Sequence, residues 1–200
     1  MKMTTPATIA DTDLLRRLRQ GDAAAFQALY QRHQSAVFRF AAMRCGSADS
    51  AADVVQEVFI GLLTGSFAFD PTRGALAPFL LGVARNLLLK HEEAQRRTAS
   101  LTEPGEDEDG EADLPDDSAE PLARMLSDER AEEVRRALAL LPPHYRDVVI
   151  LYELHDLSYL EIASICQIDL GTVRSRLSRA RSALAKRLGA HSPALTCAGK

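Results

Sequence analysis

The chain has 200 residues, 46% of them hydrophobic, and a formal net charge of −4. This length can fold as one medium domain or as two small ones. Its three cysteines form no CxxC pair and have no Cys/His ligand spacing, which excludes a disulfide framework and favours a reducing cytoplasm. The sequence contains neither a signal peptide nor an apolar segment long enough to span a membrane. We therefore expect a cytoplasmic protein without a metal, a cofactor or a membrane partner.

The negative charge is concentrated in one segment. Residues 1–98 carry 12 basic and 9 acidic side chains, residues 99–125 carry 1 and 10, and residues 126–200 carry 11 and 9. An acidic connector therefore separates two mildly basic parts. The overall charge does not argue against nucleic acid as a partner.

The N-terminal half predicts one helical module. Residues 1–10 are expected to be disordered, and the helical pattern occupies residues 11–98. An amphipathic pattern begins at Leu14 and pauses before Asp22, which is expected to cap the next helix; a further helix is expected to start after Ser47. Because few β-branched residues alternate with polar ones here, we predict an all-α fold.

The helix expected over residues 51–63 has an apolar face and a polar face. The polar face is an acidic and amide stripe that includes an isoleucine: Asp53, Gln56, Glu57 and Ile60. An apolar side chain within such a stripe indicates a surface that another protein covers. The alternative is a single exposed apolar residue, which is common on protein surfaces.

Residues 67–74, FAFDPTRG, predict a loop with two aromatic rings, and Pro78 is expected to start a long helix. The outer face of that helix carries basic and amide side chains: Arg85, Asn86, Lys90, Arg96 and Arg97. A basic face beside an aromatic loop suits single-stranded nucleic acid, because unstacked bases need rings and backbone phosphates need cations. Alternatively, the two rings anchor the loop to the core.

Within the connector, residues 99–125, the stretch 102–121 is strongly acidic and has almost no apolar residues, so it cannot bury enough surface to offset the entropy of ordering. We predict a flexible acidic linker that leaves two modules free to take their spacing from a partner. The helical pattern resumes over residues 126–188, which predict a second small helical bundle. Residues 189–200 are expected to form a frayed tail.

Residues 157–188 predict a helix-turn-helix. Ser158 and Glu161 form a capping box that starts the first helix, residues 167–171 interrupt it, and Thr172 is expected to cap the second helix. One side of the second helix is an apolar stripe. The opposite side carries basic and hydroxyl residues, and the side chains expected on DNA are Thr172, Arg174, Ser175, Arg176, Ser178, Arg179 and Arg181.

The basic face of the second helix suits the major groove of duplex DNA. Its guanidinium groups can reach phosphates or guanine edges, and its serines allow the backbone to approach closely. The alternative is an amphipathic helix whose basic face is only solvated.

Four segments in this order resemble bacterial sigma factors of the extracytoplasmic-function group, which keep only sigma regions 2 and 4. The segments are DVVQEVF (53–59), FDPTRG (69–74) with FLLGVARNLL (79–88), LPPHYRDVVIL (141–151), and LSYLEIASI (157–165) with GTVRSRLSRAR (171–181). One of these segments alone is modest evidence, but all four together are specific. The resemblance covers residues 11–98 as region 2 and residues 126–188 as region 4.

The resemblance implies partners for both modules. Region 2 would bind core RNA polymerase, at the clamp helices of its largest subunit, through Asp53, Gln56, Glu57 and Ile60. The minus-ten element of promoter DNA, with one base flipped out of the stack, would lie against Phe69, Arg85, Asn86, Lys90, Arg96 and Arg97. Region 4 would bind the flap of the second subunit and read the minus-thirty-five element with the second helix of the helix-turn-helix. Members of this group are commonly held by an anti-sigma factor.

The chain departs from the family pattern at three positions. Phe79 stands near the usual tryptophan and can supply its ring, and Ala52 stands where an acidic residue is usual. Asp156 replaces a glycine before the capping box, and we expect it to adopt the left-handed backbone conformation.

We therefore predict a sigma factor that acts by binding and is not an enzyme, because the sequence shows no nucleophile–base pair, metal cluster or phosphate-binding glycine loop. The main alternative is a stand-alone helix-turn-helix transcriptional regulator, which needs a ligand pocket or a phospho-acceptor and normally a dimer interface. A third alternative is an adaptor whose basic faces bind an acidic protein. Dependence on added core polymerase separates the first class from the other two.

Overall fold

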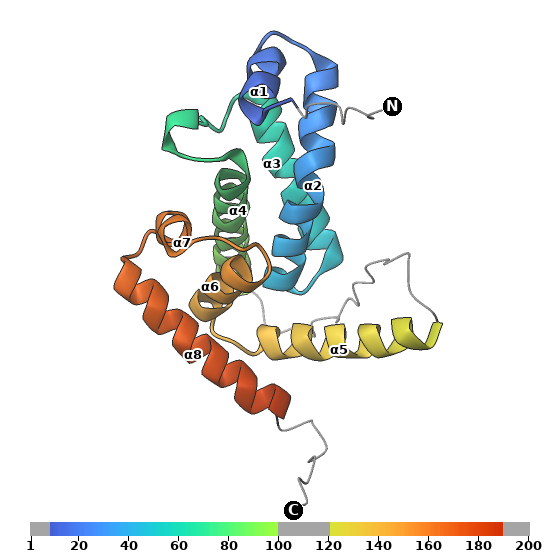
Figure 1. Ribbon diagram of the computed structural model, residues 1–200, viewed down its shortest axis with the longest axis vertical. Coiled ribbons are helices and arrows are strands. Elements are labelled where there is room, and N and C mark those ends of the chain that lie inside the picture. Colours follow the sequence, from blue (N-terminus) through green and yellow to red (C-terminus); the bar gives the residue numbers. More distant parts are fainter. Residues whose placement is uncertain (1–8, 100–120, 190–200) are drawn as a thin grey trace, which may run out of the picture.

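The computed structural model describes residues 9–99 and 121–189, and this part of the chain is all-α (Figure 1), which confirms the predicted fold class. Most of the predicted disordered N-terminus, the linker and the tail lie outside the described residues. Residues 121–125, which the sequence analysis assigned to the linker, form the start of a helix. The elements are α1 (Asp11–Arg19), α2 (Ala23–Cys45), α3 (Ala48–Thr64), the 3-10 turn η1 (Pro71–Arg73), α4 (Leu76–Ala99), α5 (Pro121–Ala139), α6 (Pro143–Glu153), α7 (Tyr159–Cys166) and α8 (Leu170–Gly189).

The helix starts follow from short polar side chains that satisfy free backbone N–H groups. Asp22 caps α2 and accepts hydrogen bonds from the backbone N–H groups of Ala24 at 2.9 Å and Ala25 at 3.2 Å. Ser47 caps α3 in the same way. Both caps confirm the sequence predictions. The helix α4 begins two residues earlier than predicted, so that Pro78 lies within its first turn.

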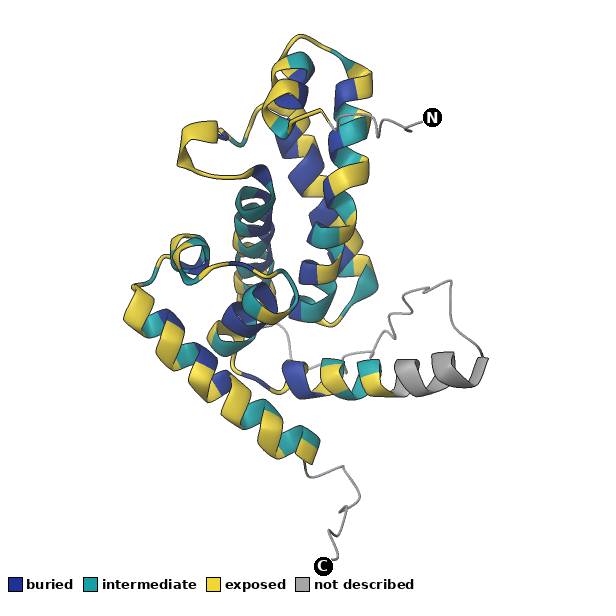
Figure 2. Ribbon diagram, in the orientation of Figure 1, coloured by how far each residue is buried: buried dark blue, intermediate teal, exposed yellow. Residues whose placement is uncertain are grey.

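Each module packs its helices around one long helix. In the first module α2 packs against α1, α3 and α4, and in the second α8 packs against α5, α6 and α7. Figure 2 shows buried residues on the facing sides of these helices and exposed residues on their outer sides. The best buried side chains include Leu29 and Val58 in the first module and Ile162 and Leu177 in the second.

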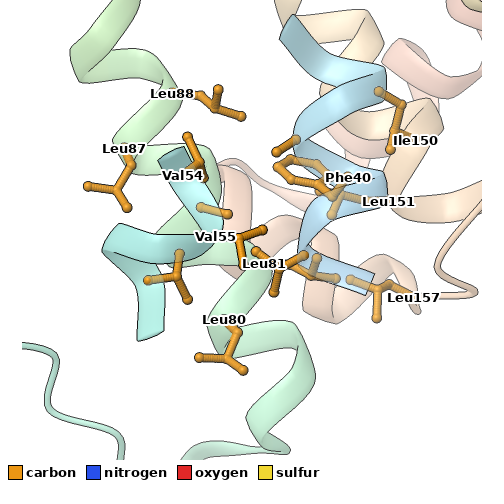
Figure 3. Close-up of a cluster of buried hydrophobic side chains, with 14 of the residues drawn as sticks. Phe40, Val54, Val55, Leu80, Leu81, Leu87, Leu88, Ile150, Leu151 and Leu157 are labelled. Atoms are coloured by element: carbon orange, nitrogen blue, oxygen red, sulfur yellow. The ribbon is translucent and has the colours of Figure 1, made fainter. Parts of the chain in front are cut away.

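The two modules are docked on each other and share one hydrophobic core. Phe40 of α2 is fully buried and lies beside Ile150 and Leu151 of α6 (Figure 3). The helix α2 also contacts α5, and α4 contacts α7. The acidic linker predicted two modules that take their spacing from a partner, whereas the structure shows the modules in direct contact. Burial of these apolar side chains favours the docked arrangement by removing their surface from water.

A cluster of charged side chains is buried in the same contact. Arg44 of α2 and Asp147 of α6 are each 1% exposed, and they form an ion pair. Arg44 also pairs with Glu92 of α4, and the Nε of Arg85 lies 2.7 Å from Oδ2 of Asp147. Burial alone lowers the pKa of Arg44, but its hydrogen bond with Glu92 and the charge of Asp147 outweigh this effect and raise the pKa above its ordinary value. Arg44 is therefore charged and fully partnered inside the protein.

His155 lies in the connection between α6 and α7, and its ring packs edge-on against Phe40 of the first module. Its Nε2 atom is buried and has no hydrogen-bond partner among the described residues. Burial, assisted by the charge of Arg39, lowers the pKa of His155 from 6.5 to about 4, although Asp156 acts in the opposite direction. The folded protein therefore holds this imidazole neutral.

We expect the free energy of unfolding to fall as the pH drops from about 6.5 to 4. The unfolded chain binds a proton on His155 near its ordinary pKa of about 6.5, whereas the folded chain resists protonation until about pH 4, so the folded state loses about 2–3 kcal/mol across this window. Urea unfolding of the wild type and of His155→Gln at pH 7.0, 5.5 and 4.5 measures this loss. The glutamine variant, which cannot be protonated, should lose less stability than the wild type, and parallel losses would contradict the assignment.

Candidate nucleic-acid interface

The helix-turn-helix consists of α7 and α8, and its first helix starts as predicted. Ser158 Oγ accepts a hydrogen bond from the backbone N–H of Glu161 at 3.3 Å, and the backbone N–H of Ser158 donates to Glu161 Oε2 at 2.8 Å. Asp156, just before this box, has a φ of 51°, which confirms the predicted left-handed conformation. The turn to α8 contains a second left-handed residue, Gln167, with a φ of 55°.

The prediction that Thr172 caps the second helix is wrong. The helix begins at Leu170, and Asp169 accepts hydrogen bonds from the backbone N–H of Thr172 at 2.8 Å and from its hydroxyl at 2.7 Å. These two bonds hold the pKa of Asp169 below its usual value. Thr172 therefore lies in the first turn of α8, with its hydroxyl turned back to the cap.

The helix α8 presents most of its predicted DNA-facing side chains to solvent. Val173, Leu177 and Ala180 are buried against the rest of the module, and the opposite face is open. Thr172 and Arg176 are half-buried. The exposed members of the predicted set are Arg174, Ser175, Ser178, Arg179 and Arg181.

Two of the exposed arginines already have partners within the module. Arg181 lies 2.6 Å from Glu153 and 4.9 Å from the centre of the Tyr152 ring. Arg179 donates a hydrogen bond to the hydroxyl of Tyr145 at 3.4 Å. The partners of both arginines belong to α6, so these contacts hold the two guanidinium groups toward α6.

The residues predicted to contact the minus-ten strand fall into two groups. Asn86, Lys90, Arg96 and Arg97 are exposed on one side of α4, and Arg97 pairs with Glu93 at 2.5 Å. The other two residues, Phe69 and Arg85, were predicted to contact the strand, but neither side chain is open to solvent. Phe69 is 8% exposed and packs against Phe79 with ring centres 5.2 Å apart, so it anchors the loop to α4. The side chain of Arg85 is 13% exposed and is paired with Asp147.

A cavity of about 410 Å³ lies between the loop, the start of α4 and α7. Phe69, Phe79 and Asn86 line it from the first module, and Leu160 and Ile165 line it from the second. The helix-turn-helix also contributes polar side chains to the lining, among them Glu161, so the cavity combines aromatic rings, an amide side chain and a wall of mixed polarity.

A second surface is formed by α3 and α2. The four predicted residues Asp53, Gln56, Glu57 and Ile60 are all exposed, and Glu57 lies 2.9 Å from His91. They lie next to a groove of about 780 Å³, lined by Gln56 and Ile60 and by rings from both helices: Phe26, Tyr30, Phe38 and Phe59.

Two parts of this surface were not predicted from the sequence. Phe26 and Tyr30 of α2 are half-buried and line the groove. Leu63 is 53% exposed and lies three residues after Ile60 on the same helix. The helical spacing of Ile60 and Leu63 was the available signal, because residues three apart share a face.

None of the helices in residues 9–99 and 121–189 combines the length and apolar character that a membrane crossing requires. Within the same residues, His, Cys, Asp and Glu side chains form no group of three that could hold a metal ion.

Both modules match known protein families. Residues 29–98 match sigma-70 region 2, and residues 131–184 match sigma-70 region 4. A region 2 module followed by a helix-turn-helix region 4 module defines the class of protein, a sigma factor.

Relatives narrow this class further. The RNA polymerase sigma-H factor of Pseudomonas aeruginosa is 33% identical over 184 residues, which cover 89% of this chain and 93% of that protein. The ECF RNA polymerase sigma-E factor of Escherichia coli K12 is 36% identical over 181 residues, which cover 88% and 93%. The chain belongs to the extracytoplasmic-function (ECF) sigma factors of the sigma-70 family.

Two solved structures share the fold. The sigma factor RpoE of Bartonella quintana, solved with the anti-sigma factor NepR, aligns with a TM-score of 0.66 and 24% identity over 84% of this chain and 98% of that one. CnrH, solved with the cytosolic domain of CnrY, aligns with a TM-score of 0.63 and 24% identity over 92% and 100%. The all-helical arrangement is thus one that known proteins adopt.

Proposed function

We propose that this chain directs RNA polymerase to a specific set of promoters, with each of its surfaces taking one partner. The observation that carries the proposal is the exposed basic face of α8, in a helix-turn-helix that follows a region 2 module along the chain. Region 2 binds the core enzyme and the melted minus-ten element, and region 4 binds the minus-thirty-five duplex. The distance between the two DNA elements then selects the promoter.

The face of α8 is suited to the major groove. Arg174 and Arg179 are exposed and long enough to reach guanine edges or phosphates. The small side chains of Ser175 and Ser178 allow the helix backbone to approach the DNA closely. Arg176 and Arg181 lie at the sides, where phosphates pass.

The loop and α4 are suited to a separated strand. A flipped base needs a pocket with rings and a hydrogen-bonding edge, and the cavity beside α4 has Phe79 and Asn86 on its wall. Lys90, Arg96 and Arg97 continue along α4 as cations for the phosphates. Strand separation is then favoured by preferential binding of the unpaired bases, without covalent chemistry.

The exposed stripe on α3 is the proposed contact with the clamp helices of the largest polymerase subunit, and region 4 is proposed to contact the flap of the second subunit. We propose that the protein acts in the cytoplasm and has no catalytic activity of its own. One solved structure of similar fold is bound to an anti-sigma factor, which supports proposing such an inhibitor as a regulator of this chain.

Run-off transcription on genomic fragments, with core RNA polymerase and with or without this protein, tests the proposal. Defined start sites are expected only when both are present. A protein that binds duplex DNA tightly alone and adds no initiation to the core enzyme would instead be a stand-alone regulator, and the proposal would be wrong.

Replacing Arg174 with alanine is expected to weaken binding of the mapped minus-thirty-five duplex by about 5- to 150-fold, which corresponds to the 1–3 kcal/mol of one bidentate base contact. Fluorescence anisotropy at one fixed salt concentration measures the loss. Arg136→Ala, which removes an exposed charge from α5, is the control and should bind as the wild type does. Equal losses in both variants would show that Arg174 contributes only general charge.

A further inference from the structure

The end of α1 carries an arginine that contacts the loop proposed to bind the strand. Arg19 is exposed and is the last residue of α1. Its Nη2 donates a hydrogen bond of 3.4 Å to the backbone carbonyl of Phe69, the residue that anchors the loop to α4. Figure 1 shows the loop passing from beside α1 to the start of α4. A guanidinium group has five N–H donors, so this contact leaves most of the donors of Arg19 available to a ligand.

A second arginine, Arg73, belongs to the loop itself. It is exposed in η1 and lines the cavity beside α4. Among the described residues, neither Arg73 nor Arg19 forms a salt bridge with a carboxylate. The acidic side chain of the loop, Asp70, caps η1 and accepts hydrogen bonds from the backbone N–H of Thr72 at 2.9 Å and from its hydroxyl at 2.7 Å. Both cations can therefore take an anion from outside the chain.

The cavity lies between two groups of cations. Arg73 and Arg19 precede α4, on the loop side of the cavity. The lining residues of α4 end at Asn86, and beyond it along the helix follow the cations already proposed for phosphate contacts, Lys90, Arg96 and Arg97. A base held in a pocket has one phosphate on its 5′ side and another on its 3′ side, and a basic groove follows such a backbone. A strand whose base enters the cavity therefore directs phosphates toward both groups.

We infer that Arg19 and Arg73 bind phosphates of the promoter strand on the 3′ side of the flipped base, so that the end of α1 is a third element of the strand-binding surface. This inference rests on the proposed function, because it takes the loop and α4 as that surface. The direction follows from chain order. From the end of α4 the chain continues to region 4, whose proposed DNA element lies upstream, on the 5′ side of the minus-ten element. The opposite end of the surface, at the loop and α1, then meets the 3′ side.

Strand length tests the inference in the complex of this chain with core polymerase. The probes are fluorescein-labelled single strands: the minus-ten sequence mapped by run-off transcription, and the same strand extended by about six nucleotides at its 3′ end or at its 5′ end. For the wild type, the 3′ extension should raise affinity about three- to tenfold, the range expected for two exposed contacts between guanidinium groups and phosphates. Fluorescence anisotropy at several salt concentrations measures the gain.

The double variant Arg19→Gln with Arg73→Gln is expected to lose most of the gain from the 3′ extension and to keep the gain from the 5′ extension. The slope of log affinity against log salt for the 3′-extended strand should become shallower by about 0.7 for each lost phosphate contact. Arg136→Gln, which removes an exposed charge from α5, is the matched control and should keep both gains.

Two substitutions of Arg19 distinguish a contact with the strand from a support for the loop. Arg19→Gln retains an amide donor for the carbonyl of Phe69 but carries no charge, whereas Arg19→Lys keeps the charge. A phosphate contact predicts that the lysine variant retains the gain from the 3′ extension and that the glutamine variant loses part of it. Both should bind the unextended strand as the wild type does. The reverse order, or an equal loss on unextended and extended strands, would assign Arg19 to the loop alone and overturn its role on the strand.

The outcomes separate this inference from the proposed function. A wild type that gains nothing from the 3′ extension overturns the inference, as does a gain that survives in the double variant. Loss of the gain from the 5′ extension in place of the 3′ extension also overturns it, because the strand would then run in the opposite direction. The proposed function fails separately, in the transcription experiment, if the wild type adds no start sites to core polymerase.

Discussion

Replacing Arg44 with alanine is expected to lower the free energy of unfolding by about 3–5 kcal/mol, the usual cost of removing one partner from a buried ion pair. Arg44 is among the largest fully buried side chains, and it is bound to Asp147 and to Glu92. Alanine leaves both carboxylates with fewer partners and leaves a cavity between α2, α4 and α6. Urea unfolding followed by far-ultraviolet circular dichroism measures the change.

Two further variants isolate the reason for this loss. Arg16→Ala removes an arginine from an exposed pair with Asp13 and should change stability by no more than about 0.5 kcal/mol. The double variant Arg44→Met with Asp147→Leu replaces the two most deeply buried charges by apolar side chains of similar size. It should recover part of the stability, because Glu92 and Arg85, which lose these partners, have more contact with water. If Arg44→Ala is as mild as Arg16→Ala, the buried pair does not stabilise the docked chain.

The sequence predicted those features that are decided within a few residues. Asp22, Ser47 and Ser158 each begin a helix because a short polar side chain reaches a backbone N–H two or three residues ahead. The same rule was ambiguous at α8, where Asp169 and Thr172 are both good caps. The structure places the cap at Asp169, three residues earlier than predicted.

The docking of the modules could not be predicted from local patterns. Arg44 is an arginine in the last turn of a long helix, a position that normally faces solvent, and its burial depends on a carboxylate 103 residues away. The helical wheel placed Arg85 on the outer face of α4 for the same reason. Its partner, Asp147, lies 62 residues away in the sequence, so no local pattern indicates the pair. For Phe69 the structure supports the alternative in which the ring anchors the loop to the core. Its ring packs against Phe79, only ten residues later in the sequence.

Replacing Ile60 with lysine is expected to weaken binding to core RNA polymerase by about thirtyfold or more and to leave folding intact. Ile60 is 50% exposed, so lysine at this position should change stability by no more than about 0.5 kcal/mol. On the polymerase the effect is large for two reasons. The change removes an apolar anchor beside the aromatic groove, and loss of such an anchor typically costs about 2 kcal/mol or more. It also places a cation one turn beyond Glu57, on the face that carries Asp53 as well, and the carboxylates of this face are suited to a basic partner surface.

The control for this experiment is Ala24→Lys, which adds the same charge at an exposed position at the start of α2, away from the groove. Both variants are measured by competition with labelled wild type for purified core polymerase, and their unfolding curves are recorded in parallel. Ala24→Lys should compete as the wild type does. If Ile60→Lys also competes like the wild type, the exposed face of α3 is not where core polymerase binds, and Ile60 is only a solvent-exposed side chain. If instead it competes poorly while it unfolds at the wild-type urea concentration, the apolar residue within an acidic stripe is a docking anchor, because its loss is then felt only in the complex.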